Sequence, residues 1–237
     1  MISEISNLDL GDASYVVVSA SVTGKGKAEN QDSLGIYHDD SQIILAMADG
    51  LGSAIHSKDG SSCMVAALVE ILVAHRSDEE GVPSMIFNSW KSKLSHDAGT
   101  CDTTCKFIRI TADETTFGGI GDGWIAMGGS YGYRELISEN TFSNQTDSIL
   151  SFDLSEHFVS SSVGTADTDC MLISTDGFSE DFDKTRGEEL LKEIRSKLVE
   201  DPASFAKDLS ALLLHWPVET NCDDKSVIII AKVNKHE

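Results

Sequence analysis

Short apolar runs separated by turn residues mark the first part of the chain. The run from Ser14 to Val22 is rich in β-branched residues, and a Gly-Lys-Gly-Lys turn follows it at residues 24–27. Such a run, bounded by turn residues, is typical of a strand. A short strand is predicted near Leu34 to Tyr37, and after a polar turn at residues 38–41 an apolar strand ends at Asp49. This order predicts an antiparallel meander.

Helical spacing of apolar residues follows in two pairs of segments. The first pair comprises Gly60 to Arg76 and a helix that begins near Pro83, a residue suited to a first helical turn. The second pair comprises Glu188 to Val199 and, after Pro202, Ala203 to His215. The apolar positions of these helices indicate faces that pack against a core rather than cofactor sites.

Short, turn-separated apolar runs fill the sequence between the helix pairs and end the chain. The predicted strands are Thr104 to Thr111, Thr115 to Ile120, Trp124 to Met127, Tyr131 to Ile137, Met171 to Thr175 and Ser226 to Val233. Residues 138–168 are polar and irregular. We expect them to form a surface excursion near the functional site, where they would contact substrate.

The order of these elements predicts an α+β fold. Helices that arrive in pairs between antiparallel strands cannot form parallel crossovers, so they should cover the outer faces of two packed sheets. We expect a four-layer α-β-β-α sandwich, with two central antiparallel sheets flanked by helix pairs. No internal repeat or proline-rich linker divides the sequence. Residues 1–237 are therefore predicted to form one domain, with a core from about residue 14 to residue 233.

The composition is strongly acidic. Lys and Arg total 18 against 39 Asp and Glu, which gives a formal net charge of −21. This charge disfavours nucleic acid and anionic membranes as partners, because both bind to basic faces. No run reaches the roughly 18 apolar residues of a membrane span, and the N-terminus lacks a basic region followed by an apolar stretch. We expect a soluble, cytoplasmic monomer.

The cysteines do not predict a metal site or a disulfide framework. The chain has five, and they are scattered without a Cys-x-x-Cys pair. Their odd number and irregular spacing support neither paired disulfides nor a structural zinc site. Cys101 and Cys105 are predicted to be reduced thiols in the core.

Carboxylates adjoin apolar strands at three places that are far apart in the sequence. Asp49 and Asp176 each end a strand and precede Gly, and Asp223-Asp224 opens the last strand. Hard divalent cations such as Mg²⁺ and Mn²⁺ prefer oxygen ligands, and two such ions can be held close together in one site. The pattern predicts a shared metal centre. Bound cations would also allow an acidic site to accept a phosphate ester.

The sequence resembles the metal-dependent protein phosphatase 2C family, in its bacterial single-domain form, over about residues 14 to 233. The motifs that carry the resemblance are Gly26-Lys27-Ala28-Glu29-Asn30-Gln31-Asp32-Ser33, Ala48-Asp49-Gly50-Leu51-Gly52-Ser53, Asp102-Thr103-Thr104, Gly119-Ile120-Gly121-Asp122-Gly123, Ser174-Thr175-Asp176-Gly177-Phe178 and Asp223-Asp224-Lys225-Ser226-Val227. They occur in the order of the family's own motifs. Such a resemblance implies one phosphatase 2C-like catalytic domain.

The resemblance implies roles for the strand-end acids. Asp49 matches the carboxylate that bridges two metal ions, and the carbonyl of Gly50 matches a ligand to one of them. Asp176 and Asp223 match the carboxylates that complete the shell of the other ion. In the family, a water that bridges the two ions is the nucleophile, so these acids are the predicted catalytic and metal-binding residues.

The remaining matched positions include acids with an alternative interpretation and two departures from the family's pattern. Asp32 matches an acid that holds metal-bound waters, and Asp122 matches one that helps to hold a third, weaker ion in bacterial members; ordinary turn residues are the alternative for both. Gln31 stands where many members have Glu, which lowers the charge around one ion. Lys27 aligns with a phosphate-binding Arg and is the predicted catalytic and substrate-binding cation, although Lys lacks a bidentate fork. Lys25 is a competing candidate.

The function that the resemblance implies is a serine/threonine protein phosphatase with a role in signalling. It would use Mn²⁺ or Mg²⁺, as two ions with a third in some members, to hydrolyse phosphoserine and phosphothreonine. The substrate would be a phosphorylated protein, paired with a Ser/Thr kinase. The alternative is a phosphatase-like binding or sensing module with weak catalysis, which the residues at positions 27 and 31 leave open.

Other motifs point to different chemistry but lack the structural context that they need. The Gly-x-Ser-x-Gly pattern at residues 128–132 fits a nucleophile elbow, yet a strand-like run follows it instead of a helix. Strands also follow the Gly-x-Gly-x-x-Ala pattern that begins at Gly121, which argues against dinucleotide binding. His56 is the histidine nearest in sequence to the loop that follows Asp49. It is a candidate acid for the leaving group, but an exposed loop histidine is the simpler interpretation.

Overall fold

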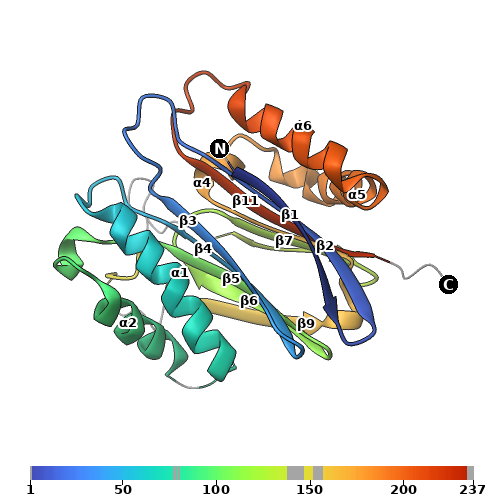
Figure 1. Cartoon of the computed structure of the whole chain (residues 1–237), viewed down its shortest axis with the longest axis horizontal. Helices are drawn as coiled ribbons and strands as arrows, with labels where there is room; N and C mark the ends of the chain where they lie inside the picture. The colour runs from blue at the N-terminus through green and yellow to red at the C-terminus, as the bar shows by residue number, and fades with distance from the viewer. Residues whose placement is uncertain (1, 77–78, 80, 138–146, 152–156, 234–237) are drawn as a thin grey trace.

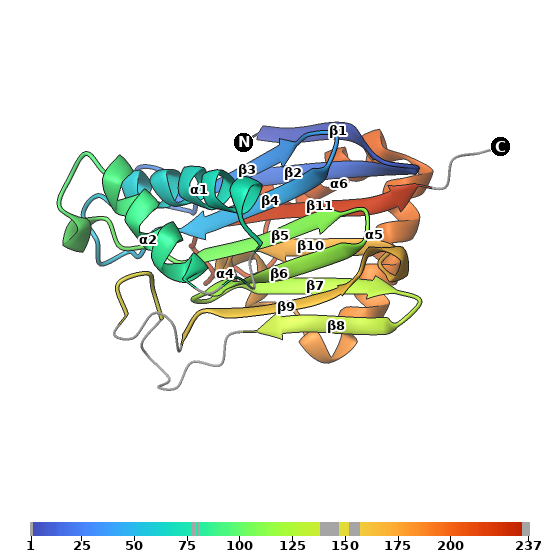
Figure 2. The same ribbon diagram turned by 90° about the horizontal axis from the view of Figure 1, so that it is seen from below.

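Two antiparallel sheets lie face to face in the computed structural model, which describes residues 2–76, 79, 81–137, 147–151 and 157–233. Within these residues, one sheet has six strands in the order β1-β2-β11-β10-β7-β8, and the other has five in the order β3-β4-β5-β6-β9. Figures 1 and 2 show the two sheets stacked, with helices on the outer side of each. The sequence prediction of a four-layer α-β-β-α sandwich is confirmed.

All of the strands except β1 and β9 agree closely with the predicted apolar runs. The strands of the larger sheet are β1 (Ile2–Leu10), β2 (Ala13–Val22), β7 (Trp124–Gly129), β8 (Gly132–Ile137), β10 (Cys170–Ser174) and β11 (Lys225–Val233). Those of the smaller sheet are β3 (Asp32–His38), β4 (Gln42–Asp49), β5 (Cys105–Thr111), β6 (Glu114–Ile120) and β9 (Val159–Gly164). Alternate residues of the central strands face two different cores, which explains their nearly continuous apolar sequences.

The helices cover the sheets in sequential pairs. The smaller sheet is covered by α1 (Ser57–Ala74) and α2 (Val82–Lys93), and the larger sheet by α5 (Gly187–Glu200) and α6 (Pro202–Leu214). Pro83 and Pro202 both lie in the first turn of a helix, where a missing N–H costs nothing. Short helical turns complete the described chain: η1 (Ala98–Thr100), η2 (Thr165–Asp167), η3 (Lys184–Arg186) and α4 (Asp176–Ser179).

Three buried clusters hold these layers together. One lies between the larger sheet and α5 with α6, a second between the smaller sheet and α1 with α2, and a third between the two sheets. Tyr15, Met47 and Ile125 belong to the third cluster and are almost completely buried. Burial of apolar surface on both faces of each sheet fixes the strand register, and with it the strand ends where the predicted site lies.

The structure differs from the sequence prediction at both edges of the sandwich. Strand β1 was not predicted, because its residues are mostly polar and exposed, and even Ile5 is 42% exposed; its ladder with β2 makes it a strand. Strand β9 lies inside residues 138–168, which were expected to be irregular, and it pairs with β6. Residues 138–146 and 152–156 of that segment lie outside the described residues. Among the described helices, none is long and apolar enough to cross a membrane.

Candidate functional site

Asp32 and Asp49 lie side by side at one end of the smaller sheet. Asp32 begins β3 and Asp49 ends β4, and the two residues are direct partners in the antiparallel ladder. Directly paired residues project from the same face of a sheet. Asp32 is 3% exposed and Asp49 is partly buried. The register of one hairpin thus places two carboxylates together in a poorly solvated position.

Asp176 approaches this pair from the larger sheet. It begins the short helix α4, directly after β10 and Thr175. Its side chain shares a hydrogen bond with that of Asp49, and the hydroxyl of Thr175 donates to Asp32 Oδ2 at 3.0 Å. The predicted acids of the two sheets therefore meet across the sandwich, and a strand end supplies each of them.

The pair Asp223-Asp224 closes the group on its other side. A side chain on Gly177 would place its Cβ 2.0 Å from the Asp224 carbonyl oxygen, so only glycine allows this approach between α4 and the start of β11. Asp224 is 1% exposed, and its carboxylate accepts hydrogen bonds from the backbone N–H groups of Gly24 at 2.7 Å and Gln31 at 2.9 Å. Asp224 thereby anchors the loop before β3, whereas Asp223 is more exposed, and its charge helps to raise the pKa values of Asp49 and Asp176.

The chain around Asp49 is held by main-chain contacts. The Asp49 carbonyl oxygen accepts hydrogen bonds from the Thr103 hydroxyl and the Thr104 N–H, both at 2.8 Å. Gly50 forms an isolated bridge with Thr103, and its N–H donates to the carbonyl of Gln31 at 3.2 Å. The predicted carbonyl ligand thus follows directly after the strand end. These hydrogen bonds fix the backbone of Asp49, because they hold both its own carbonyl group and the N–H of the next residue.

The electrostatics of the group show an excess of negative charge. Burial, followed by the charges of Asp32 and Asp176, raises the pKa of Asp49 well above its usual range. Burial likewise raises the pKa of Asp176, and it raises that of Asp32 to about 7 despite hydrogen bonds from neighbouring hydroxyls. Two carboxylates within hydrogen-bonding distance require either a shared proton or a cation. An all-oxygen, strongly acidic donor set of this kind fits hard divalent ions such as Mg²⁺ and Mn²⁺.

Asp122 lies in the turn between β6 and β7, close enough for its charge to raise the pKa of Asp176. Beside it is Lys106, which the sequence analysis missed. This lysine is 2% exposed, and its Nζ donates to the Gly121 carbonyl at 2.7 Å. Burial lowers the pKa of Lys106 to about 8, while the charges of Asp122 and Asp176 act in the opposite direction. A lysine within an apolar strand was the available signal, because such a charge is rarely buried without an acidic partner.

Lys27 is close to the acids but already has partners. Its Nζ forms a very short ion pair with Asp223 and a second with Asp224 at 3.1 Å, and the Gln31 amide oxygen lies at 3.5 Å. Burial lowers the pKa of Lys27, but the bonds and charges of these two aspartates outweigh it and raise the pKa overall. The residue is at the edge of the predicted site, whereas Lys25 is exposed in the preceding turn.

The rival motifs are not part of this group. The hydroxyl of Ser130 donates to Asp167 Oδ1 at 2.8 Å in the turn between β7 and β8, so its setting is not the strand-to-helix turn of a nucleophile elbow. His56 stacks on His96, with ring centroids 3.7 Å apart. The described carboxylates that the sequence singled out are therefore together, whereas the contacts of Ser130 and His56 given above are with residues outside this group.

Comparison with known families gives one match over most of the chain. The family model described as Protein phosphatase 2C matches residues 24–214. This range includes Asp32, Asp49, Asp122 and Asp176, and it ends before Asp223. No relative was found among curated proteins.

Solved structures with the same fold come from bacterial phosphatases and a related protein. RsbX in complex with magnesium is 15% identical, with a TM-score of 0.64 and coverage of 98% of this chain and 100% of that chain. The catalytic domain of the serine threonine protein phosphatase PstP with two manganese ions is 16% identical, with a TM-score of 0.65 and coverage of 93% and 99%. The serine/threonine phosphatase Stp1 from Staphylococcus aureus is 17% identical, with a TM-score of 0.63 and coverage of 91% and 94%. At these identities the likeness shows the fold.

Proposed function

The chain belongs to the protein phosphatase 2C family, and on this premise we propose that it is a metal-dependent phosphatase of phosphoserine and phosphothreonine in proteins. One observation carries the proposal. Strand and helix ends bring Asp32, Asp49 and Asp176 together beside Asp223, although burial and mutual repulsion raise the pKa values of the first three. Such a group stores unfavourable charge that divalent cations would relieve. Residues 1–237 would then act as one catalytic domain.

The metal-binding residues follow the family roles. Asp49 would bridge two ions, with the Gly50 carbonyl on one of them and Asp176 and Asp223 on the other. Asp32 would hold coordinated waters, and Asp122 would help to hold a third ion. RsbX was solved with magnesium and PstP with manganese, which supports these two metals as the cofactors to test. When bound, divalent ions supply an activated water and offset the charge of the phosphate.

The protein's own residues position that chemistry. Thr103 and Thr104 fix the backbone of Asp49 through its carbonyl oxygen, and Thr175 orients Asp32. Lys27 would exchange part of its contact with Asp223 for a phosphoryl oxygen once cations compensate the aspartates. A single ammonium donates from one point, so it orients the phosphate less strictly than the arginine found in many relatives.

The described part of residues 138–168 includes contacts to the residues that support the acidic site. The hydroxyl of Ser148 donates to Asp102 Oδ2 at 2.8 Å, and Ile149 N–H donates to the Thr103 carbonyl at 2.9 Å. Thr103 is the residue that holds Asp49. We propose that residues 147–151 belong to the surface that receives the phosphorylated protein, whose phosphate a Ser/Thr kinase would have added.

The second candidate function is a phosphatase-like module that senses metal or a partner with little turnover. The observation in its favour is the pairing of Lys27 with Asp223 and Asp224, which occupies the predicted phosphate-binding cation. Gln31 in place of the more common Glu also reduces the charge available to bind one ion. The intact set of Asp49, Asp176 and Asp223 favours catalysis.

Hydrolysis assays separate the two functions. A small aryl phosphate and a phosphothreonine peptide would be incubated with the purified protein in Mn²⁺, in Mg²⁺ and in EDTA, beside the Asp49→Asn variant. We expect turnover with either metal that EDTA removes and that Asp49→Asn lowers by at least a hundredfold, because the variant loses the bridging charge. Wild-type turnover no greater than that of Asp49→Asn would eliminate the enzyme. Saturable binding of Mn²⁺ without turnover would support the sensing module.

A further inference from the structure

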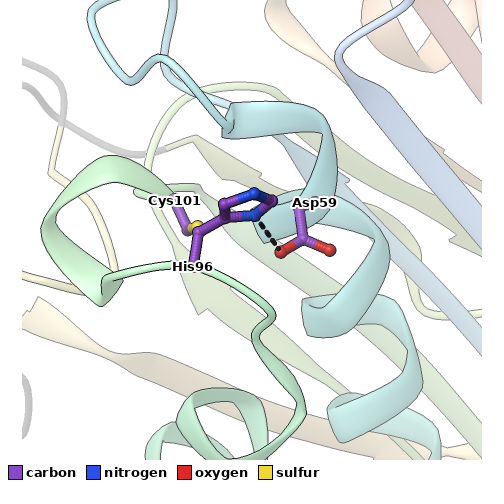
Figure 3. Close-up of side chains that lie close together, drawn as sticks. All are labelled: Asp59, His96 and Cys101. Carbon is purple, nitrogen blue, oxygen red and sulfur yellow. Dashed lines mark hydrogen bonds and ion pairs between the residues drawn. The ribbon is translucent and has the colours of Figure 1, made fainter.

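A second group of metal-ligating side chains lies at the start of α1, on the outer side of the smaller sheet, and shares no residue with the acidic site. Asp59 is in the first turn of α1, His96 is in the connection after α2, and Cys101 follows η1. Figure 3 shows the three side chains pointing toward one another from these separate elements. The wide sequence separation explains why cysteine spacing gave no indication of this group.

The ligand atoms of the group are compactly arranged. One carboxylate oxygen, one imidazole nitrogen and the Cys101 sulfur all lie within 4.8 Å of one another. His96 Nδ1 is 3.2 Å from Asp59 Oδ2. Cys101 is completely buried, whereas the side chains of His96 and Asp59 are 45% and 29% exposed. The sulfur is therefore at the base of the group, and a cation can enter past the other two ligands.

The surrounding chain holds these side chains in place. A Cβ on Gly60 would lie 1.8 Å from the Cys101 carbonyl oxygen, so the glycine lets the Cys101 backbone press against α1. The N–H of Ser95 donates to Asp59 Oδ2 at 3.2 Å, and the His56 ring stacks on His96 with an interplanar angle of 15°. A preformed ligand set binds a metal more tightly, because less conformational entropy is lost on binding.

We propose that Asp59, His96 and Cys101 bind a zinc ion or another borderline divalent transition metal. Nitrogen, sulfur and carboxylate ligands in small number are typical of tetrahedral zinc, whereas Mg²⁺ and Mn²⁺ favour oxygen. Water would complete the coordination on the exposed side. The Cys101 thiol would release its proton to solvent, since thiolate is the form that binds metal. Cys63, four residues after Asp59, places a second sulfur 3.8 Å from Asp59 Oδ1.

The position of the metal gives it a structural consequence. It would link the start of α1 to residues 96–101. The next two residues support the acidic site: the Asp102 carbonyl oxygen accepts a hydrogen bond from Leu51 N–H at 3.0 Å, and the Thr103 hydroxyl donates to the Asp49 carbonyl. Zinc binding would therefore stabilise one wall of the acidic site without contributing a ligand to it. This inference does not depend on the proposed phosphatase activity.

Cobalt substitution tests the site, because Co²⁺ occupies zinc sites and reports its ligands. Titration of the metal-free protein with Co²⁺ should produce the intense sulfur-to-cobalt charge-transfer absorption, which oxygen ligands in the acidic site do not give. One equivalent of Zn²⁺ should displace it. His96→Asn, an exposed change that does not endanger folding, should weaken Co²⁺ binding by at least tenfold, and Cys101→Ser should abolish the absorption.

The chain offers a matched control for His96. His75 Nδ1 also lies 3.2 Å from a carboxylate, that of Glu79, and it is similarly exposed. His75→Asn should leave the cobalt spectrum and the zinc-induced rise in melting temperature unchanged, whereas His96→Asn should reduce both. Absence of the sulfur-to-cobalt absorption in the wild-type protein, or its full retention in His96→Asn, would overturn the proposal, whatever the result of the phosphatase assay.

Discussion

The acidic site and the Asp59–His96–Cys101 group shift the pKa values of their carboxylates in opposite directions. In the acidic site, burial and neighbouring charges raise the pKa values of Asp49 and Asp176. Burial also raises the pKa of Asp59, but bonds from His96 and from the Ser95 N–H outweigh it and lower the pKa overall. One region is therefore short of positive charge, whereas the other already satisfies its carboxylate with protein groups.

This difference separates carboxylates that need added positive charge from a carboxylate that protein groups already stabilise. In the acidic site, a bound cation would relieve the repulsion between carboxylates, so binding should increase the free energy of unfolding substantially. In the Asp59 group, metal must replace existing hydrogen bonds and displace a proton from Cys101, so the net gain is smaller. The donor atoms also differ, with oxygen on one side and mixed nitrogen, oxygen and sulfur on the other. The two regions should therefore select different metals.

The largest effect that tests this comparison is on turnover. Asp176→Asn should lower Mn²⁺-dependent hydrolysis of a small aryl phosphate about a thousandfold, or about 4 kcal/mol, because it removes a proposed metal ligand. In EDTA the same variant should unfold at a higher temperature than the wild type, since an amide removes repulsion and its oxygen can still accept a hydrogen bond from Asp49. Turnover with Mn²⁺ and thermal unfolding in EDTA measure the two expected effects.

Asp208→Asn is the matched control for that substitution. Asp208 is an exposed residue of α6, which covers the outer face of the larger sheet, so its amide should change neither turnover nor stability appreciably. A fall in the melting temperature of metal-free Asp176→Asn would contradict the view that Asp176 is held against repulsion.

The second largest effect is stabilisation by Mn²⁺. At a concentration 100 times the dissociation constant, binding should stabilise the wild-type protein by about 2.7 kcal/mol, which raises the melting temperature of a chain of this length by about 5–10 °C. The Asp49→Asn variant should show little of this rise, because Asp49 is the proposed shared ligand. Differential scanning calorimetry with and without Mn²⁺ measures it. An equal rise in both proteins would place the bound Mn²⁺ elsewhere.

The proximity of the strand-end carboxylates could be predicted from the sequence, because the strand ends determine their positions. Asp49 and Asp176 follow continuous apolar runs, whose burial between two layers leaves little choice of register, so the position of each carboxylate follows from the strand. Lys106 was not predicted as a site residue, because its link to the site depends on acids that tertiary structure brings close to it. No local pattern shows that Asp122 and Asp176 compensate a lysine in an otherwise apolar strand.

The Asp59 group could not be predicted, for a related reason. Its residues come from a helix, a connection and a short helical turn, and the close contact of Gly60 with Cys101 brings them together. That contact depends on how α1 and α2 pack, which includes a hydrogen bond from Trp90 Nε1 to the Gly60 carbonyl at 3.0 Å. Strand β1 also depended on its partner, because its own residues bury little apolar surface. Features fixed by local burial were predicted, and those fixed by tertiary contact were not.

The third effect is a pH dependence confined to the metal-free protein. The raised pKa of Asp32, about 7, means that the native state holds more protons than the unfolded state between about pH 4 and pH 7. Stability is therefore present at low pH and is lost as the pH rises through 7. In EDTA we expect a loss of about 1–2 kcal/mol between pH 6 and pH 8, measured by urea unfolding. Mn²⁺ should flatten the profile, and a flat profile in EDTA would show that these carboxylates are not repelled.

The smallest effect distinguishes the two regions most directly. Asp59→Asn makes the same chemical change as Asp176→Asn, but it removes a carboxylate that His96 and the Ser95 N–H already stabilise. In EDTA it should lower the free energy of unfolding, by less than about 1 kcal/mol because the ion pair is partly exposed. With Zn²⁺ the deficit should grow, since the wild-type protein alone gains from the metal. Urea unfolding of both variants under identical conditions provides the test. If both substitutions stabilise the metal-free protein, Asp59 is as poorly compensated as Asp176, and the contrast between the two regions fails.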